Sequence, residues 1–340
     1  MKKMKDYYKK TIIDMNVNMN MDWTNNPDLN ETDLNNISSN CGYDILIGTN
    51  NGEEVRRAYQ TKPWPSDSEI YNQESEENKR EHKLLKFTGI GSGIISIRLN
   101  GTVLNPENPP QFEYKYDISD SWEEYTYTLN KTQIDGMILT LAPGKSGAPV
   151  SVELRGISSD CSLQFTITGG NVEASGDITS LINGIGGDCE LSADCFSSMF
   201  DRCTSLTTAP ELPATTLDYN CYNGMFKGCT SLTQAPTLPA TTLAEACYEN
   251  MFSGCTSLTQ APVLPATTLA EACYSQMFGG CTSLEYIKCL AIDITTAKCT
   301  ESWVTDVSAT GTFVKASGVE WNTGSSGTPE GWTVIIDGEE

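Results

Sequence analysis

The chain has 340 residues, with 44 acidic against 22 basic side chains and a formal net charge of −22 at pH 7. A charge this negative argues against a nucleic-acid binder and against a polybasic membrane-surface protein, because both need clustered lysine and arginine. The single histidine, His82, excludes most histidine-based catalytic triads and nearly all zinc sites. The length predicts about two or three domains, with a core that need not depend on disulfides.

Residues 1–85 are polar and rich in asparagine, with few evenly spaced apolar positions. The lysines near the start are not followed by the apolar stretch of a signal peptide, and no longer apolar run predicts a transmembrane helix. We therefore expect synthesis in the cytoplasm without export, the alternative being a chain that lacks its signal. Because such a composition buries little apolar surface, we predict an arm that anchors the protein to a partner.

Residues 86–168 hold short runs of alternating apolar and polar side chains, separated by Gly, Pro and Asn turns. This pattern is typical of β-strands, expected at 84–88, 94–99, 111–116, 125–129, 137–141, 150–154 and 163–167. Strands at this spacing predict a small β-sandwich-like domain. The glycine-rich residues 169–194 follow as a linker or N-terminal cap, and their glycine cluster at 184–187 lacks the lysine of a phosphate loop.

From Cys195 onward the sequence repeats with a constant period. Residues 195–220, 221–246 and 247–272 are nearly identical units, and a fourth unit begins at Cys273 and then diverges. The length of one unit lies in the range of leucine-rich repeats, and near-identity over three units makes the repeat the strongest signal in the chain.

In the unit 247–272, the apolar residues at positions 0, 1, 4, 5 and 8 fall within about 140° of arc on a helical wheel. This spacing predicts one buried face of a short helix. Gly254 suits the C-terminal end of that helix, and Pro262 and Pro265 keep the next stretch extended. Each unit is therefore predicted to run as helix, turn, short strand and return, and to bury its apolar side by stacking on its neighbours.

Eight of the thirteen cysteines stand eight residues apart within units. That spacing is too wide for a zinc site and, across two helical turns or about 12 Å, for a disulfide. We expect small buried hydrophobic residues in two ladders. The predicted repeat core consists of Cys221, Met225, Phe226, Cys229, Leu232, Cys247, Met251, Phe252, Cys255, Leu258, Cys273, Met277, Phe278 and Cys281. The cysteines left unassigned are Cys41, Cys161, Cys189, Cys289 and Cys299.

Tyr222, Tyr248 and Tyr274 recur at one position of the units. A row of aromatic rings is a candidate ligand surface for sugars, but its place at the flank of the buried face favours packing. Trp303, Trp321 and Trp332 are expected in the core of a C-terminal cap. No catalytic residue, cofactor site or metal site is predicted: acidic neighbours such as Glu123 and Glu124 need not converge, and no calcium loop is present.

The units resemble BspA-like leucine-rich repeats, in which a short helix ends in an aromatic residue before a Cys-x-x-Leu step into a strand. Here that segment runs from Met225 to Leu232. The variant with Leu-Pro-Ala-Thr-Thr-Leu is similar to proteins of gut bacteria and their phages, and the ending after Cys281 resembles that group's terminal cap. The resemblance covers residues 195–340 and implies recognition by a solenoid surface without catalysis.

The predicted fold class is therefore α+β and multidomain, with five successive parts. These are an extended arm (1–85), a β-sandwich-like domain (86–168), a linker or N-terminal cap (169–194), a short solenoid of four leucine-rich repeats (195–284) and a C-terminal cap (285–340).

The sequence predicts a non-enzymatic binding or structural protein. A surface-type repeat without an export signal suits a tailed-phage virion protein: a capsid decoration, fibre or tail component. Its arm would bind other virion proteins, and its repeats would bind host surface glycan or protein. A bacterial cell-surface adhesin is the alternative, and a glycan-processing enzyme is a third class. No nucleic-acid partner or membrane insertion is expected, and a homo-oligomer is compatible with the sequence.

Overall fold

The computed structural model describes residues 43–50, 53–60, 83–103, 109–157 and 161–339. The chain divides into two compact units, residues 1–81 and 82–340. In the first unit, β1 (Tyr43–Asn50) and β2 (Glu53–Gln60) pair as an antiparallel hairpin with a β-bulge at Leu46. Cys41, His82 and the other residues of the predicted anchoring arm at 1–42, 51–52 and 61–82 lie outside the described residues, whereas Leu85, its last residue, begins β3.

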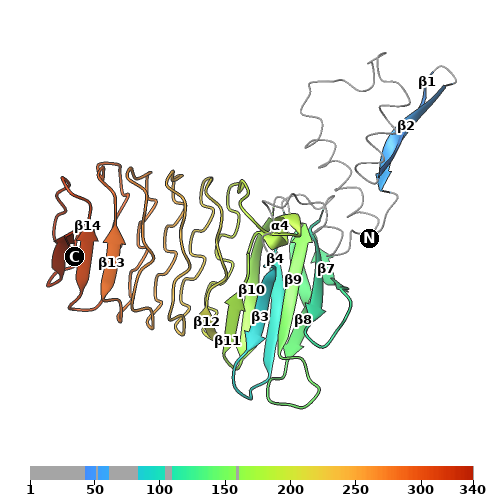
Figure 1. Ribbon diagram of the computed structural model, residues 1–340, viewed down its shortest axis with the longest axis horizontal. Helices are drawn as coiled ribbons and strands as arrows, with labels where there is room; N and C mark the ends of the chain where they lie inside the picture. The colour runs from blue at the N-terminus through green and yellow to red at the C-terminus, as the bar shows by residue number, and fades with distance from the viewer. Residues whose placement is uncertain (1–42, 51–52, 61–82, 104–108, 158–160, 340) are drawn as a thin grey trace. The chain divides into compact units, whose positions relative to one another are not determined.

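The second unit begins with two facing β-sheets (Figure 1). Their strands are β3 (Leu85–Gly89), β4 (Ile95–Val103), β5 (Gln111–Tyr116), β6 (Glu123–Tyr125), β7 (Tyr127–Asn130), β8 (Gln133–Leu141), β9 (Ser151–Ile157), β10 (Cys161–Gly169), β11 (Val172–Ser175) and β12 (Leu206–Thr208). The four-stranded sheet has the order β10-β4-β8-β7, and the six-stranded sheet has the order β12-β11-β3-β9-β5-β6. All pairs are antiparallel except β11 with β12.

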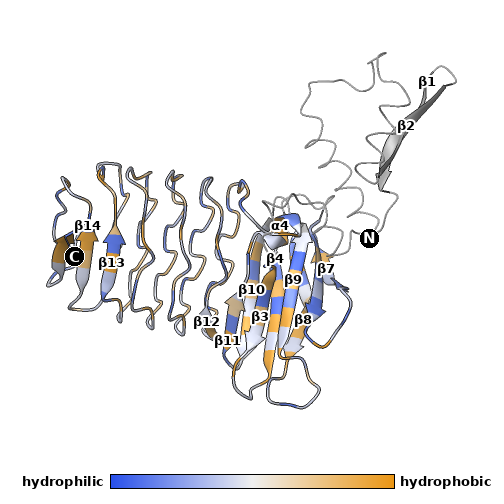
Figure 2. Cartoon of the chain, viewed as in Figure 1, coloured by the Kyte–Doolittle hydropathy of each residue, from blue (hydrophilic) through white to orange (hydrophobic). Residues whose placement is uncertain are grey.

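Alternation of buried and exposed side chains along these strands explains why their sequences predicted them (Figure 2). Every predicted strand lies on a strand of the structure, with one difference. The expected strand 125–129 is broken at Thr126, and its halves β6 and β7 belong to different sheets. The chain crosses from one sheet to the other at this residue. Because apolar and polar residues continue to alternate through the crossing, the sequence does not show the break.

The inner faces of the two sheets meet through aromatic side chains. The rings of Phe87 and Phe165, one from each sheet, lie edge to face with centroids 5.0 Å apart. Tyr125 is buried, and its hydroxyl donates to the Met137 carbonyl at 2.7 Å and accepts from the Leu99 N–H at 2.8 Å. These bonds satisfy a polar group that would otherwise be costly inside the core.

Replacing Gly136 with alanine is expected to destabilise this part of the fold. An added Cβ would collide with the Leu99 carbonyl and the Tyr125 hydroxyl, and the first of these is backbone that cannot rotate away. Overpacking of this kind costs about 1–3 kcal/mol, which urea unfolding would measure. Gly279→Ala is the matched control, because its Cβ would meet only ordinary contacts at 3.5 Å or more. Equal losses at both sites would contradict the assignment.

Residues 169–194, predicted as a linker or N-terminal cap, hold β11 and α4 (Ser180–Asn183). Strand β11 pairs in parallel with β12, which lies in the first repeat unit. The Leu85 N–H donates to the Ser180 hydroxyl at 3.0 Å, so α4 is fixed to the six-stranded sheet. This segment therefore extends the sheet into the repeats.

The repeat units lie on one another as successive rungs (Figure 1). Parallel bridges join residues at equivalent positions of successive units, such as Thr208 with Gln234 and Thr216 with Thr242. We call residues 195–336 the repeat stack.

The segment of each unit predicted as a helix is a chain of turns. In the unit 247–272, the N–H groups of Met251 and Ser253 donate to carbonyls three residues earlier, at 3.2 and 3.0 Å. The alternate N–H groups of Asn250 and Phe252 donate instead to carbonyls of the next unit, at 2.8 and 2.9 Å. An α-helix would use each N–H for the carbonyl four residues back and leave no donor for the neighbouring unit.

A left-handed residue recurs every fourth position in this segment and prevents a helix from propagating. In the same unit these residues are Ala246, Asn250 and Gly254, with φ of 54°, 57° and 76°. The predicted α+β class with a helix-containing leucine-rich-repeat solenoid is therefore wrong. The part of the chain that the structure describes is β-rich, and its one helix, α4, lies outside the repeats.

The predicted C-terminal cap continues the rungs. Strands β13 (Tyr286–Cys289), β14 (Thr312–Lys315) and β15 (Thr333–Ile336) form a parallel three-stranded sheet. Tyr286 pairs with Thr312, which lies one repeat period further along the chain. The spacing of the repeats thus persists from β13 to β14, where the sequence no longer repeats, and shortens to 21 residues between Thr312 and its partner Thr333 on β15.

Candidate functional site

All fourteen side chains predicted for the repeat core are fully buried. The phenylalanines form one column of near-parallel rings: Phe200, Phe226, Phe252 and Phe278 are 5.5–5.7 Å apart between neighbours. Phe165 of β10 lies 5.2 Å from Phe200 and extends this column into the four-stranded sheet. Trp303 ends it, 6.2 Å from Phe278.

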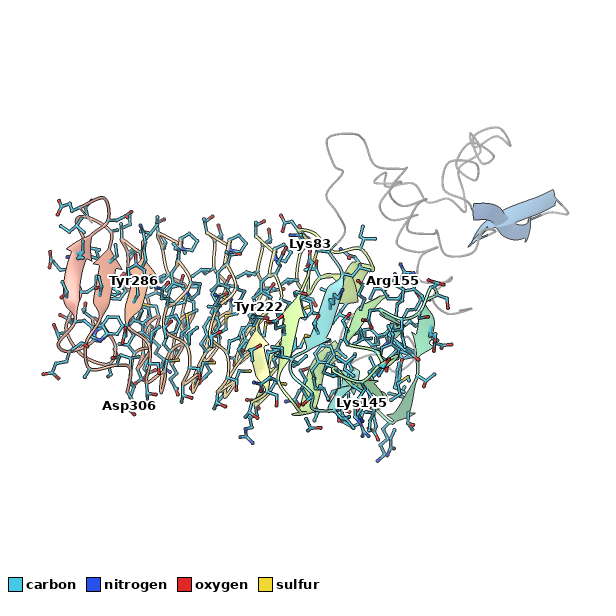
Figure 3. All side chains as sticks on the ribbon, turned by 60° about the horizontal axis from the view of Figure 1, so that its bottom comes forward. Lys83, Lys145, Arg155, Tyr222, Tyr286 and Asp306 are labelled. Carbon is cyan, nitrogen blue, oxygen red and sulfur yellow. The ribbon has the colours of Figure 1, made fainter. Side chains whose placement is uncertain are left out.

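The tyrosine row forms a second internal column and is not a ligand surface. Tyr222, Tyr248 and Tyr274 are each 1% exposed, and their rings stack on one another at 5.9 and 6.2 Å. Figure 3 places Tyr222 among the side chains of the stack. The Tyr222 and Tyr248 hydroxyls are buried without a hydrogen-bond partner. Because both ring faces are covered, no sugar can stack on them.

The second cysteine of each unit donates its S–H to the carbonyl of the phenylalanine in the preceding unit. The bonds from Cys229, Cys255 and Cys281 measure 3.0, 3.1 and 3.0 Å. Cys203 makes the same bond to Phe165 at 3.2 Å, so β10 acts as the rung before the first unit. Burial raises the pKa of Cys203 to about 12. These thiols are structural, because nucleophilic attack requires an accessible thiolate.

Three of the unassigned cysteines lie among the described side chains, and all three are free thiols. Cys289 and Cys299 are buried, and Cys299 follows Cys273 by one repeat period. Burial raises the pKa of Cys189 to about 11, with a further contribution from the nearby Asp177. The side chain of Cys161 and all of Cys41 lie outside the described part of the structure.

Trp303 and Trp332 are buried and Trp321 is half-buried, at the C-terminal end of the stack. Trp303 donates its indole N–H to the Gly327 carbonyl at 2.8 Å, and Trp332 donates to the Ser308 carbonyl at 2.7 Å. Trp321 lies 5.5 Å from Trp303, ring to ring. All three rings pack inside the protein.

The predicted glycine cluster surrounds a buried aspartate. Asp177 is 6% exposed and accepts bonds from the Thr179 N–H and hydroxyl at 2.8 and 2.7 Å, and from the Gly187 N–H. Burial raises the pKa of Asp177. Gly186 has φ of 84°, and a Cβ there would touch the Asp177 carboxylate. The cluster therefore closes a tight turn around this carboxylate.

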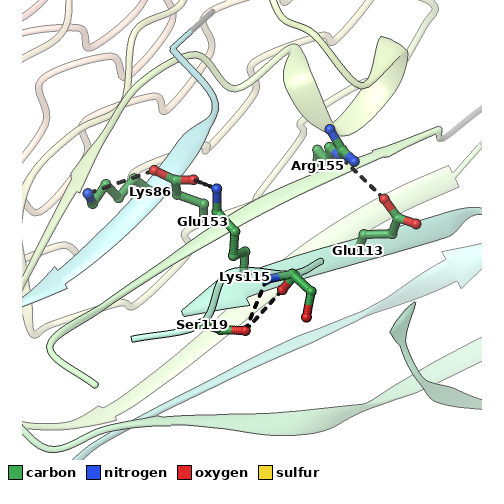
Figure 4. Close-up of polar contacts among 7 residues, drawn as sticks. Lys86, Glu113, Lys115, Ser119, Glu153 and Arg155 are labelled. Atoms are coloured by element: carbon green, nitrogen blue, oxygen red, sulfur yellow. Dashed lines mark hydrogen bonds and ion pairs between the residues drawn. The ribbon is translucent and has the colours of Figure 1, made fainter. Parts of the chain in front are cut away.

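The outer face of the six-stranded sheet carries a chain of ion pairs (Figure 4). Glu153 lies 3.8 Å from the Lys86 ammonium and 3.6 Å from that of Lys115, and Glu113 lies 3.1 Å from the Arg155 guanidinium. Arg155 is 4% exposed and also lies 4.1 Å from the Trp122 ring centroid. Because a cation neutralises each carboxylate, this face does not offer the carboxylate pair of a glycosidase.

Glu123 and Glu124 are neighbours on β6, where successive side chains point to opposite faces. Glu123 accepts a bond from the Tyr114 hydroxyl at 2.6 Å.

Within the described ranges, no group of three or more His, Cys, Asp or Glu side chains could hold a metal ion. Among these residues there is also no helix long and apolar enough to cross a membrane.

Two kinds of surface remain on the repeat stack. The first is the turn edge, which we define as the third, fourth, seventh and eighth residues of each unit: 197–198, 201–202, 223–224, 227–228, 249–250, 253–254, 275–276, 279–280, 301–302 and 305–306. The second is the threonine surface, which consists of exposed threonines repeated in each unit, such as Thr230, Thr241 and Thr242. The turn edge runs along one margin of the stack, where Figure 3 labels Asp306.

Threonine hydroxyls of the threonine surface join neighbouring rungs by bonding to backbone carbonyls. Thr233 donates its hydroxyl to the Thr207 carbonyl at 3.2 Å, and Thr256 donates to the Thr230 carbonyl at 3.5 Å, each bridging two rungs. Thr207 likewise bonds Val172 of β11 at 3.1 Å. A β-branched residue also favours the extended backbone of these positions.

Side chains of the turn edge bond both to one another and to backbone carbonyls of the edge, as the Ser197 hydroxyl does to the Asn223 carbonyl at 3.3 Å. The Asn223 amide donates to the Glu249 carboxylate of the next unit at 3.0 Å. From the sequence, Glu249, Asn250 and Ser253 were expected to face solvent because they are polar and vary between units, and no role was given to them. The structure places these three residues in half-buried positions.

Comparison of the chain with protein-family models, with curated proteins and with solved structures gives no match.

Proposed function

We propose that the protein is a non-catalytic binding protein that presents the repeat stack to a surface partner. The single observation that carries this proposal is the division of each unit into a fully buried core and a polar outside. Most thiols and tyrosine hydroxyls of the units are inside; Tyr219, which is 47% exposed, and the half-buried Cys195 are the exceptions, both in the first unit. The side chains left outside are amides, hydroxyls and carboxylates held on a hydrogen-bonded frame, which suits recognition.

Cross-unit bonds make this frame rigid, and rigidity lowers the entropy lost on binding. Each unit donates alternate N–H groups of its turn segment to the next unit at 2.7–3.1 Å. A partner that spans several units would therefore meet preformed rows of side chains. Weak contacts repeated along the stack add up through multivalency.

For the biological setting, we propose a component of a tailed-phage virion, such as a capsid decoration, fibre or tail protein. Residues 1–85 would anchor it to other virion proteins, and the repeat stack would bind host surface glycan or protein. The basis is the sequence resemblance of the Leu-Pro-Ala-Thr-Thr-Leu units to proteins of gut bacteria and their phages. A bacterial cell-surface adhesin is the second candidate, because the same resemblance includes it.

Mass spectrometry of purified virions tests the setting. Finding the chain there in stoichiometric amount supports the virion role, and a chain lacking residues 1–40 should then be absent from virions while its repeat stack stays folded. If the chain is absent from virions but is released from intact bacterial cells by protease shaving, the adhesin is correct. Release of reducing sugar from host polysaccharide by the purified chain would contradict the non-catalytic role.

A further inference from the structure

Among the units that begin at Cys221, Cys247 and Cys273, differences are concentrated on the turn edge, whereas the first unit, 195–220, differs from 221–246 at ten positions, of which four lie on this edge. Over their full length, the units 221–246 and 247–272 differ at four positions, three of which lie on this edge. Over their first twelve residues, the units beginning at Cys221, Cys247 and Cys273 differ at the third, fourth and seventh residues only. The three variable residues are Asn223, Gly224 and Lys227 in the first of these units, Glu249, Asn250 and Ser253 in the second, and Ser275, Gln276 and Gly279 in the third.

Exposure alone does not explain this pattern. Thr230, Thr256 and Thr282 are exposed and do not change between units, whereas Asn223, Glu249 and Ser275 are half-buried or buried and do change. If tolerance of substitution followed exposure, the threonines would vary first. One of them, Thr256, donates its hydroxyl to the Thr230 carbonyl of the preceding rung at 3.5 Å. At the turn edge, successive units share the same backbone conformation and differ only in their side chains.

The chemistry of the turn edge fits a ligand made of hydroxyl groups. Its twenty positions hold amide, hydroxyl, carboxylate and basic side chains and glycines, with no aromatic or aliphatic side chain. Protein–protein hot spots depend on buried Trp, Tyr or Arg anchors in apolar surroundings. The recurring aromatic side chains of the repeat units are inside the stack, and the exposed Tyr219 lies outside the turn edge. Planar amides and carboxylates pair instead with the neighbouring hydroxyls of a sugar ring, as donor and acceptor together.

The spacing of the rungs also fits an extended glycan. Hydrogen-bonded neighbouring strands lie about 4.8 Å apart, and one pyranose unit of an extended chain advances by a similar length. A glycan that lies along the turn edge would therefore place each sugar beside one rung. The repeated contacts compensate for the absence of an aromatic platform.

We propose that the turn edge is the glycan-binding surface of the protein, and that its exposed variable side chains, such as Lys227 and Gln276, select the sugar bound at each rung. This proposal rests on the binding function proposed above and assigns to it a surface and a ligand class.

The test exchanges one rung for its neighbour. In the triple variant Asn223→Glu, Gly224→Asn and Lys227→Ser, one unit takes the edge residues of the next. Because the new carboxylate at position 223 lies beside Glu249, urea unfolding must first show that this variant is as stable as the control. Gly224 and Asn250 have φ of 59° and 57°, so asparagine suits the left-handed position. Thr237→Val is the control, since it makes the fourth difference between these units at an exposed position away from the edge.

The full-length chain and both variants are applied to an array of purified bacterial capsular and lipopolysaccharide glycans. We expect the triple variant to lose about tenfold or more in binding to the best glycan, or to select another, which corresponds to about 1.4 kcal/mol. Thr237→Val should match the wild type. Equal binding by all three chains would overturn the assignment of the edge. A wild type that binds intact host cells but no glycan would overturn the ligand class and leave the binding function standing. Binding to neither would overturn both.

Discussion

Raising the pH from about 7 to about 10 is expected to unfold the repeat stack, because its thiols are buried as neutral groups. Burial raises the pKa of Cys221 to about 11 and the pKa of Cys247 and Cys281 to about 12. In the unfolded chain a thiol titrates near its ordinary pKa of about 8.5. Above that pH the unfolded chain loses protons that the folded chain keeps, so the free energy of unfolding falls as the pH rises.

The expected size of this effect is large. Each such thiol removes about 1.4 kcal/mol of stability per pH unit above its unfolded pKa, until its folded pKa is reached. Nine of the described thiols are buried. Because burial raises the pKa of each of these thiols, their contributions have the same sign, and together they are a substantial part of the stability of a typical domain, about 5–15 kcal/mol. Burial also holds the pKa of Tyr222, Tyr248 and Tyr274 well above its usual value, which adds to the loss at higher pH.

Urea unfolding followed by circular dichroism between pH 7 and pH 10 measures this dependence. The double variant Cys229→Ala, Cys255→Ala provides the control. It should be less stable than the wild type at neutral pH, where it lacks two S–H bonds and buried volume. Its stability should fall less steeply at alkaline pH, because two titrating thiols are gone. A free energy of unfolding that stays constant up to pH 10 would contradict the burial of neutral thiols.

The buried side chains of the repeats could be predicted from the sequence, whereas their backbone could not. Three near-identical units show which apolar residues recur, so the core positions follow from stacking. Counted from the first cysteine of a unit, the apolar residues at positions 0, 4 and 8, and those at 1 and 5, recur every four residues. This period is close to the roughly 3.6 residues per turn of an α-helix. Over nine residues the two periods nearly coincide. Asn220, Gly224 and Gly228 place asparagine or glycine at every fourth position of one unit, which was a signal for the turns, but Ala246 and Ala272 occupy the same left-handed position in the next units.

The ends of the stack depend on tertiary contacts that leave no local pattern. Phe165 alternates along β10 like any inward-facing strand residue, and its sequence does not show that it precedes Phe200 in a column. Thr312 pairs with Tyr286 through the backbone, so the spacing of the repeats survives where side-chain identity has been lost. The turn edge likewise has no motif within a single unit. Its proposed role depends on comparing the residues at equivalent positions of different units.

Truncating one ring of the phenylalanine column, by Phe252→Ala, is expected to cost about 3–5 kcal/mol, as buried phenylalanines usually do. Phe252 is fully buried, and its ring lies between Phe226 and Phe278 at 5.7 Å from each. The cavity would interrupt the column that joins the four-stranded sheet to Trp303. The backbone bonds between rungs hold the neighbouring rings in place, so they cannot close the gap. Urea unfolding at neutral pH would measure the loss.

Val263→Ala in the same unit is the matched control, because Val263 is 49% exposed and should cost less than about 0.5 kcal/mol. Phe252→Leu should fall between the two, since leucine keeps most of the apolar volume while losing the stacked ring. If Phe252→Ala and Val263→Ala lose the same free energy, the units do not share an internal column. If Phe252→Ala changes only the slope of the unfolding transition, the rungs unfold one at a time, and the column does not couple them.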